Sequence, residues 1–184
     1  MRRTIGKIFI AVGLLIISVV IYTNYNISQK NNKVVEKYKK STKYEEIDRT
    51  EPYIENIVGI LNIPKIDLEV VVKTGTDKET LKSSVGHFEG SVMPGEEGNF
   101  AIAGHRNYTS NKFLSNLDKL EKNDEIKVES KGKIYRYKVS NIEVVEPEEV
   151  SVIDSTEKKE ITLVTCTPKF IGSHRLIVKG EYVK

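Results

Sequence analysis

The stretch Thr162-Leu163-Val164-Thr165-Cys166-Thr167-Pro168 holds the only cysteine in a chain of 184 residues. Its first half is an apolar, β-branched run that is typical of a buried strand. Pro168 ends this strand because proline has no amide hydrogen to donate to a sheet. Cys166 therefore lies at the mouth of a strand, which is a rigid support for a nucleophile. A free cysteine that packs as a small apolar residue fits the same position, so placement alone leaves both interpretations open.

Other short apolar runs around this strand predict a mostly β domain that is closed or nearly closed as a barrel. The expected strands are 57–63, 68–72, 99–104, 125–129, 133–145, 161–165 and 176–183. The apolar residues of 133–145 do not share one parity, and we therefore expect a bulge or bend there.

Two short helices complete the predicted domain. One spans 77–83, with Asp77 as the N-cap. The other spans 111–120, where four apolar side chains fall on one helical face: Phe113, Leu114, Leu117 and Leu120. The segment Gly86-His87-Phe88-Glu89-Gly90 is interpreted as a loop.

The N-terminus carries the clearest physical signal. With Ile5 included, the apolar run from Ile8 to Tyr22 is long enough to cross a bilayer as a helix. Three basic residues come before it: Arg2, Arg3 and Lys7. The positive-inside bias therefore predicts a cytoplasmic N-terminus and an extracellular body. A cleaved signal peptide is the alternative, but residues 21–26 lack the small-residue cleavage pattern, and a buried core helix is the third interpretation.

The segment that follows is polar and rich in Lys, Asn and Glu, and it is interpreted as a stalk that lifts a domain off the membrane. This gives three parts: 1–27 as cytoplasmic stub and anchor, 28–53 as stalk, and 54–184 as the folded domain. A short amphipathic helix within the stalk would use Val34, Val35 and Tyr38. The formal charge of +3, carried by scattered basic residues, does not predict nucleic-acid binding.

Export places a lone cysteine where disulfides form, so it is buried and inert, paired with another molecule, or reactive. A reactive thiol needs a proton-transfer partner, and the chain has three histidines: His87, His105 and His174. His105 follows a predicted core strand, as Cys166 does, and two strand ends on one rim of a barrel can meet. His87 and His174 fit surface or structural histidines better.

Acyl transfer also needs positive charge where the tetrahedral oxyanion develops. Arg175 begins the strand that follows Cys166, which predicts a neighbouring position on the rim. Arginine stays charged at every working pH and offers a fork of donors. Arg106 competes for this role, and either arginine taken alone also fits a solvated surface charge.

Three motifs resemble those of the sortases. The run from Thr162 to Cys166 resembles their Thr-Leu-x-Thr-Cys signature. Ala103-Gly104-His105-Arg106 resembles their histidine motif, and Ser173-His174-Arg175-Leu176 resembles their arginine strand. The resemblance runs from about residue 54 to residue 183 and keeps the order His, Cys, Arg.

The resemblance implies an eight-stranded sortase β-barrel and a cysteine transpeptidase that cuts a Leu-Pro-x-Thr-Gly sorting signal between Thr and Gly. It makes Cys166 the nucleophile, His105 the general acid and then base, and Arg175 the residue that binds substrate and stabilises the oxyanion. It also implies substrate contacts beside these motifs: Ala103, Thr165 and Thr167. The implied partners are surface proteins with such a signal and an amine acceptor on peptidoglycan, its precursor or another protein.

Within this family the chain is most similar to class D sortases. Pilus-building sortases add a C-terminal membrane helix and an Asp-Pro-aromatic lid, whereas this chain ends at Lys184 without a second apolar run. Glu51-Pro52-Tyr53 departs from the lid pattern at its acid. These departures favour a class D enzyme, and a pilin polymerase is kept as the alternative within the family.

Two functions of other classes stay open. A cysteine hydrolase of cell-wall peptides would release its product with water, and a non-catalytic anchored domain would bind a surface partner without needing the thiol. No cofactor is expected. Some sortases use calcium, and Glu146-Pro147-Glu148-Glu149 could bind it, but a solvated turn around the proline is the favoured interpretation of this acidic stretch.

Overall fold

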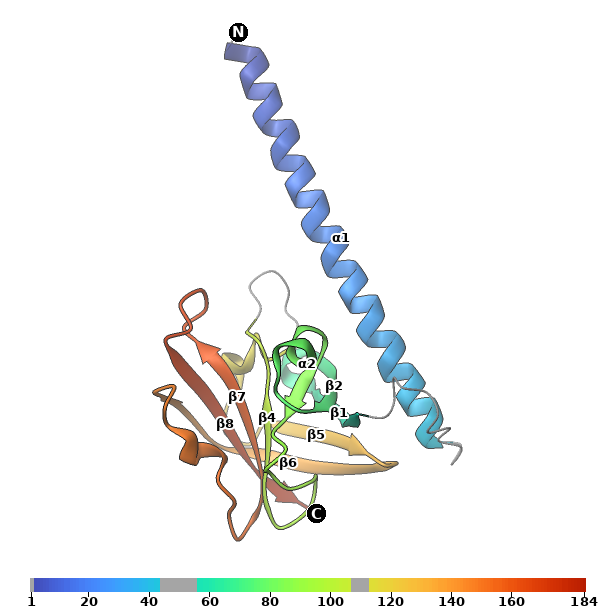
Figure 1. Cartoon of the computed structure of the whole chain (residues 1–184), viewed down its shortest axis with the longest axis vertical. Helices are drawn as coiled ribbons and strands as arrows, with labels where there is room; N and C mark the ends of the chain where they lie inside the picture. Colours follow the sequence, from blue (N-terminus) through green and yellow to red (C-terminus); the bar gives the residue numbers. More distant parts are fainter. Residues whose placement is uncertain (1, 44–55, 107–112) are drawn as a thin grey trace.

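The computed structural model describes residues 2–43, 56–106 and 113–184, and these form one long helix and a closed barrel of eight strands (Figure 1). The strands are β1 (Ile57–Ile63), β2 (Leu68–Thr74), β3 (Val85–His87), β4 (Gly98–Ala103), β5 (Glu125–Ser130), β6 (Lys133–Val145), β7 (Lys159–Thr167) and β8 (His174–Val183). The helices are α1 (Arg2–Lys43) and α2 (Lys78–Ser83), with 3-10 turns η1 (Pro64–Ile66), η2 (Leu117–Lys119) and η3 (Val150–Ile153). The predicted eight-stranded barrel is confirmed.

The order of strands around the barrel brings three segments that are distant in sequence side by side. The order is β1-β2-β3-β4-β7-β8-β6-β5, and β5 closes the circle by pairing with β1. β4 and β7 are parallel, so both strands end on the same rim. β8 is antiparallel to β7 and therefore begins on that rim. We call this end of the barrel the upper rim.

Strand alternation decides which side chains enter the barrel. The interior is one apolar core to which the three central strands contribute pairs of alternate residues: Phe100 and Ile102 from β4, Ile161 and Leu163 from β7, and Leu176 and Val178 from β8. In each strand, the residues that alternate with these inward-facing residues take the outer face. Every assignment of a site residue to a face below follows from this parity.

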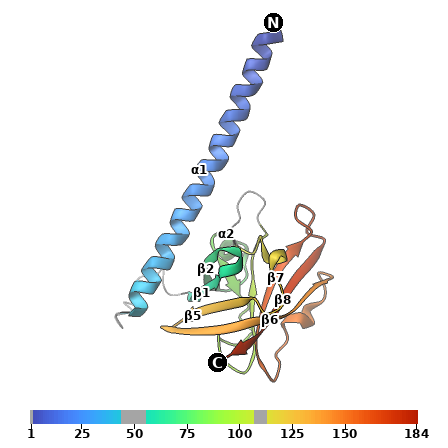
Figure 2. The same ribbon diagram turned by 180° about the vertical axis from the view of Figure 1, so that it is seen from behind.

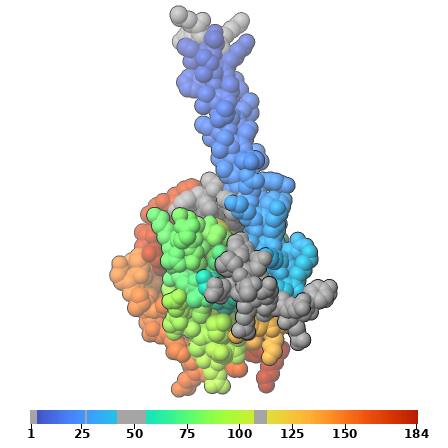
Figure 3. All heavy atoms as spheres, turned by 45° about the vertical axis from the view of Figure 1, so that its right-hand side comes forward, coloured from blue at the N-terminus to red at the C-terminus, as the bar shows by residue number. Residues whose placement is uncertain are grey.

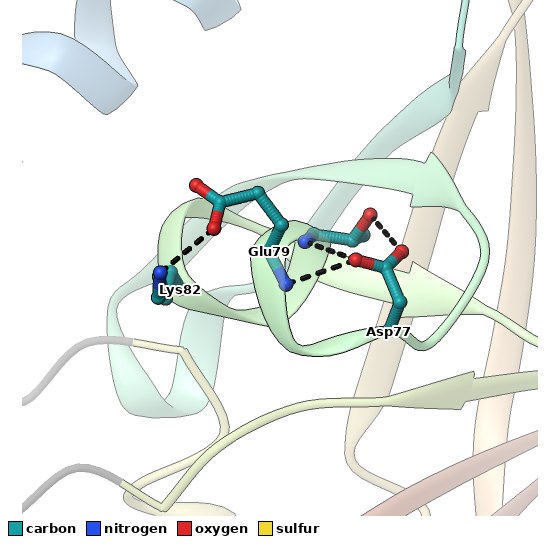
Figure 4. A network of polar contacts seen from close by, with 4 residues as sticks. Asp77, Glu79 and Lys82 are labelled. Carbon is teal, nitrogen blue, oxygen red and sulfur yellow. Dashed lines mark hydrogen bonds and ion pairs between the residues drawn. The ribbon is translucent and has the colours of Figure 1, made fainter.

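Most predicted elements are confirmed, several of them to within two residues at each end. The expected bulge in β6 appears as a register shift between Val139 and Asn141 in the pairing with β8. Asp77 caps α2, because its Oδ1 accepts hydrogen bonds from the backbone amides of Glu79 and Thr80 at 2.9 and 3.1 Å (Figure 4). Glu79 also pairs with Lys82 one turn later at 2.7 Å.

Two local predictions are wrong. His87 was expected in a loop, but it ends β3 and is buried. A helix was expected over 111–120; residues 111–112 lie outside the described part, and 113–120 form a turn and η2 instead. Phe113 has φ +55°, a left-handed conformation that cannot continue a right-handed helix. The four apolar residues of this segment are nevertheless all in the core.

α1 continues without a break from Arg2 to Lys43 and is about 63 Å long at 1.5 Å per residue. Its N-terminal part is long and apolar enough to cross a membrane, and that apolar part is not buried against the barrel. Residues 28–43 of the predicted stalk are the other end of this helix, and Val35 and Tyr38 in it pack on β1 and β2. Figure 3 shows this light-blue end of the helix lying against the body of the molecule. The rest of the predicted stalk, with Glu51-Pro52-Tyr53, lies outside the described residues.

Candidate active site

Strand register pairs Cys166 with Arg175, and the segment that carries His105 continues from the end of β4 beside β7. Cys166 pairs directly with Arg175 across β7 and β8. Ala103, the last residue of β4, pairs with Val164 of β7, and His105 and Cys166 each lie two residues further on. The ladder extends into this region, because the amide of Gly104 donates to the carbonyl of Val164 at 3.0 Å. We call these three residues the upper-rim row.

The upper-rim row faces outward from the barrel. Ile161 and Leu163 point into the core, so Cys166 has the opposite parity in β7. The same argument places Arg175 on the outer face of β8, opposite Cys166. His105 is exposed, while Cys166 and Arg175 are half-buried, and the cysteine is a free thiol. The strand that carries the thiol is therefore flanked on one side by β4, which leads to His105, and on the other by β8, which carries Arg175.

An apolar row lies beside the upper-rim row on the same face. Ala103 pairs with Val164, and Val164 pairs with Ile177 of β8. Ile177 is fully buried although its parity is outward, so the surface is covered at that position. Ala103, which was predicted to contact substrate, thus stands in an apolar wall two residues from the level of the thiol.

The β6–β7 connection is fastened over this face by a buried amide. The Nδ2 of Asn99 donates to the carbonyls of Val152 and Asp154, both at 3.2 Å. The Oδ1 of Asn99 accepts from the hydroxyl of Thr162 at 2.8 Å. Thr162, the first residue of the cysteine motif, therefore holds Asn99, and Asn99 holds the connection that contains η3. The sequence analysis missed this role of Asn99.

Arg175 is steered by the turn between β7 and β8. Its Nη1 donates to the carbonyls of Gly172 and His174, both at 3.1 Å. Within the described residues, its Nε and Nη2 make no hydrogen bond. Gly172 has φ +67°, and a methyl group on it would lie 3.5 Å from the Cβ of Cys166. The turn therefore folds directly over the cysteine and leaves part of the guanidinium fork for a ligand.

Arg106, the competing arginine, is used elsewhere. It is buried, and its Nη2 lies 2.9 Å from the Oδ1 of Asp118. Its Nη1 donates to the hydroxyl oxygen of Thr167 at 2.8 Å. By parity both Arg106 and Thr167 belong to the inner side of the rim, away from the thiol. Arg106 thus supports the end of β7, and the hydroxyl of Thr167, which was expected to contact substrate, accepts its hydrogen bond.

Thr165 and Gly104 hold the ends of β4 and β7 together beneath the row. The side chain of Thr165 is 2% exposed, and its hydroxyl donates to the carbonyl of Gly104 at 2.7 Å. A methyl group on Gly104 would come within 2.7 Å of Leu114 and 2.9 Å of Val85, so the core requires glycine there. Thr165, which was predicted to contact substrate, is buried here and joins β7 to the residue before His105.

The other two histidines have partners of their own. His87 packs on Phe100 with ring centroids 5.0 Å apart, and its Nε2 lies 2.9 Å from the Oγ of Ser91 and 3.1 Å from the carbonyl oxygen of Val92. Burial lowers the pKa of His87. His174 is on the surface, with its Nε2 3.2 Å from a carboxylate oxygen of Glu146. Both fit the structural interpretation.

Residues 146–149, where calcium was considered, form a turn in which the amide of Glu149 donates to the carbonyl of Glu146 at 3.1 Å. The three carboxylates of this stretch are exposed. In the described part of the chain, no group of three or more His, Cys, Asp or Glu is arranged to hold a metal ion.

Comparisons with known proteins agree on one family. The sequence profile of the sortase domain matches residues 61–183. Sortase SrtE1 of Streptomyces coelicolor is 35% identical over 99% of this chain, and sortase D of Bacillus subtilis is 33% identical over 68% of it. The chain spans 57% and 63% of the length of these two relatives.

Solved structures show the same likeness. The Clostridium perfringens sortase D5 transpeptidase is 36% identical, with a TM-score of 0.72 over 84% of this chain and 98% of that one. Sortase C of Streptococcus pneumoniae is 27% identical, with a TM-score of 0.67 over 91% of this chain and 97% of the other. The predicted resemblance is confirmed over the whole barrel. The chain belongs to the sortase family.

Proposed function

We propose that this chain is a membrane-anchored cysteine transpeptidase that cleaves a Leu-Pro-x-Thr-Gly sorting signal between Thr and Gly. The observation that supports it best is the upper-rim row, in which Cys166 lies between the strand that carries His105 and the strand that carries Arg175. A thiol, an imidazole and a guanidinium on one face are the groups that acyl transfer needs.

In the first step, Cys166 reacts as the thiolate, with its proton on His105, and its Sγ attacks the carbonyl carbon of the signal's Thr. The oxyanion that forms is stabilised by the donors of Arg175 that the β7–β8 turn does not use. The C–N bond to Gly then breaks, and the imidazolium of His105 gives its proton to the departing amine. The product of this step is a thioester between Cys166 and the Thr carbonyl.

In the second step, an amine of the cell wall attacks the thioester, and the neutral imidazole of His105 takes the amine proton. The C–S bond breaks and Cys166 is regenerated. Water is the competing nucleophile. The outcome therefore depends on which nucleophile reaches the thioester beside the exposed His105 and the half-buried Cys166. An amine acceptor shifts the products from hydrolysis to transpeptidation.

The apolar row fits the first two residues of the proposed signal, Leu and Pro, which are apolar. Ala103 of β4 and Val164 of β7 pair beside the thiol and are only partly buried, so they offer apolar surface, whereas Ile177 at the β8 end of the row is covered. A Leu-Pro pair placed there sets the Thr carbonyl two to three residues further along, at the level of Cys166. The held β6–β7 connection forms the side of this surface.

A class D enzyme that anchors proteins to the cell wall is the first choice within the family, supported by the likeness to the sortase D5 transpeptidase and to sortase D. A pilin polymerase is the alternative, because sortase C of Streptococcus pneumoniae, a structure described for its pilin substrate specificity, is also similar. The proposed location is the cell membrane, with the N-terminus cytoplasmic and the barrel outside.

The test is cleavage of a fluorogenic Leu-Pro-x-Thr-Gly peptide, with and without an added amine such as a short cell-wall peptide. We expect release of the Gly-bearing half in both cases and a new acyl–amine product only when the amine is present. Product formation by water alone, unchanged at high amine concentration, would support the hydrolase instead.

A further inference from the structure

The turn between β7 and β8 carries an apolar tip at the upper rim. Phe170 is 77% exposed and Ile171 is 74% exposed, more than any other large apolar side chain in the described residues. They exceed even the apolar residues of α1 that are suited to a membrane. Lys169 precedes them, so the tip reads Lys169-Phe170-Ile171. We call these three residues the tip.

Hydrogen bonds within the β7–β8 turn fix the backbone of the tip. The carbonyl of Pro168 accepts from the amides of Ile171 and Gly172 at 3.3 and 2.9 Å, which closes a tight turn. Arg175 fastens the far side of the turn through the carbonyl of Gly172. Phe170 takes the left-handed conformation, with φ +73°, within this frame. This frame holds two largely exposed apolar side chains at the turn.

The docked end of α1 fixes how the barrel is oriented on its helix. Val35 and Tyr38 of α1 are buried against Ile60 and Val71 of the barrel. Polar contacts surround this apolar patch. The Nδ2 of Asn31 donates to the carbonyl of Glu69 at 2.9 Å, and the hydroxyl of Tyr38 accepts from the amide of Lys131 at 3.2 Å. A helix held at several points on two strands and a turn does not pivot freely about the barrel.

The upper rim faces the apolar half of α1. Figures 1 and 2 show β4 and β7 ending, and the β7–β8 turn projecting, on the side toward which the N-terminal part of α1 runs. The apolar run ends at Tyr22 and docking begins at Asn31, nine residues later, a rise of about 14 Å. A membrane crossed by α1 therefore lies close above the upper rim.

We propose that the tip inserts into the outer interface of the bilayer that α1 crosses, so that the upper-rim row is held at the membrane surface. An aromatic and a branched apolar side chain fit the boundary between headgroups and acyl chains. Lys169 can extend its ammonium group to anionic headgroups. The inference rests on the membrane anchor of the proposed function and not on its chemistry. A second attachment point beside Cys166 favours substrates that are themselves held at the membrane.

The absence of tryptophan in this chain permits a single-reporter test. Phe170→Trp and, as a matched control, Ile134→Trp are made in the full chain and reconstituted into vesicles of phosphatidylcholine and phosphatidylglycerol with brominated acyl chains. Ile134 is 51% exposed and lies at the start of β6, away from the upper rim. We expect bromine quenching at position 170 to exceed that at 134 by roughly twofold or more. Equal, weak quenching at both positions would overturn the proposal.

A second pair of measurements distinguishes the bilayer from a substrate peptide as the partner of the tip. Phe170→Ser with Ile171→Ser should leave KM for a soluble signal peptide unchanged and lower the rate only with a substrate anchored in the same vesicle. A raised KM for the soluble peptide, together with unquenched Phe170→Trp, would contradict membrane insertion and assign the tip to substrate. Quenching is read without turnover, so failure of the proposed chemistry leaves this test intact.

Discussion

Cys166 and Arg175 are directly opposed on β7 and β8, on the outer face of the barrel. Arg106, which follows His105 in the chain, lies on the inner side of the same rim and is paired with Asp118. Strand alternation thus separates two arginines that the sequence presents as equal candidates. Arg175 lies on the same face as the thiol and has donors that its own turn does not use. Arg106 instead stabilises the end of the strand that carries the thiol.

Arg175→Lys is expected to lower kcat/KM for signal-peptide cleavage by about 10²-fold or more, because a point charge does not replace a fork of donors at an oxyanion. The melting temperature should change little, since this side chain is half-buried and bonds only to carbonyls of its own turn among the described residues. Steady-state kinetics and thermal unfolding measure both. Near-normal kinetics would move the oxyanion role to backbone amides.

Arg106→Ala should act first on stability. It removes a charge-assisted hydrogen bond to Thr167 and the pairing with Asp118, and we expect a loss of about 2–3 kcal/mol in the free energy of unfolding. Urea denaturation checks this. An unchanged denaturation midpoint with abolished turnover would show that Arg106, and not Arg175, acts on the substrate.

His105→Ala is expected to lower kcat by about 10²- to 10⁴-fold, the usual contribution of a positioned general acid and base. His174→Ala is the matched control, because it removes a histidine from the same rim that contacts Glu146 rather than the thiol. Both variants should unfold like the wild type. A larger loss in His174→Ala than in His105→Ala would exchange the two assignments.

His87 should make folding pH-dependent. Burial lowers its pKa from the ordinary 6.5, so the folded state binds this proton less readily than the unfolded state. The corresponding stability is present above pH 6.5 and is lost as the pH falls through the lowered pKa. Urea midpoints at pH 7.5 and pH 5 should therefore differ more in the wild type than in His87→Gln. Equal differences in the two proteins would contradict this role of His87.

Much of the barrel could be predicted because its strands are read from local patterns. The β-branched run that ends at Pro168 and the parity break near Val139 each mark a feature within a few residues. Asp77 is recognised as a cap for the same reason. The candidate row also follows from strand ends, since His105, Cys166 and Arg175 each border a run of apolar residues.

What could not be predicted depends on contacts between distant segments. β3 has three residues, too few to show alternation, and it exists because β2 and β4 pair with it. The apolar spacing of 113–120 marks burial correctly, but it does not distinguish a helix from a turn that packs the same side chains. The hydrogen bonds from Asn99 to Val152 and from Arg106 to Thr167 join residues more than fifty positions apart, and no local pattern in the sequence predicts them.

The most direct test of the account is the intact mass of the full chain after mixing with a Leu-Pro-x-Thr-Gly peptide library, with and without hydroxylamine. The account predicts an adduct that ends at the signal's Thr, sits on Cys166, is removed by hydroxylamine and is absent from Cys166→Ala. Cleavage that persists in Cys166→Ala, or a folded protein with a titratable thiol that gives neither adduct nor cleavage, would contradict it.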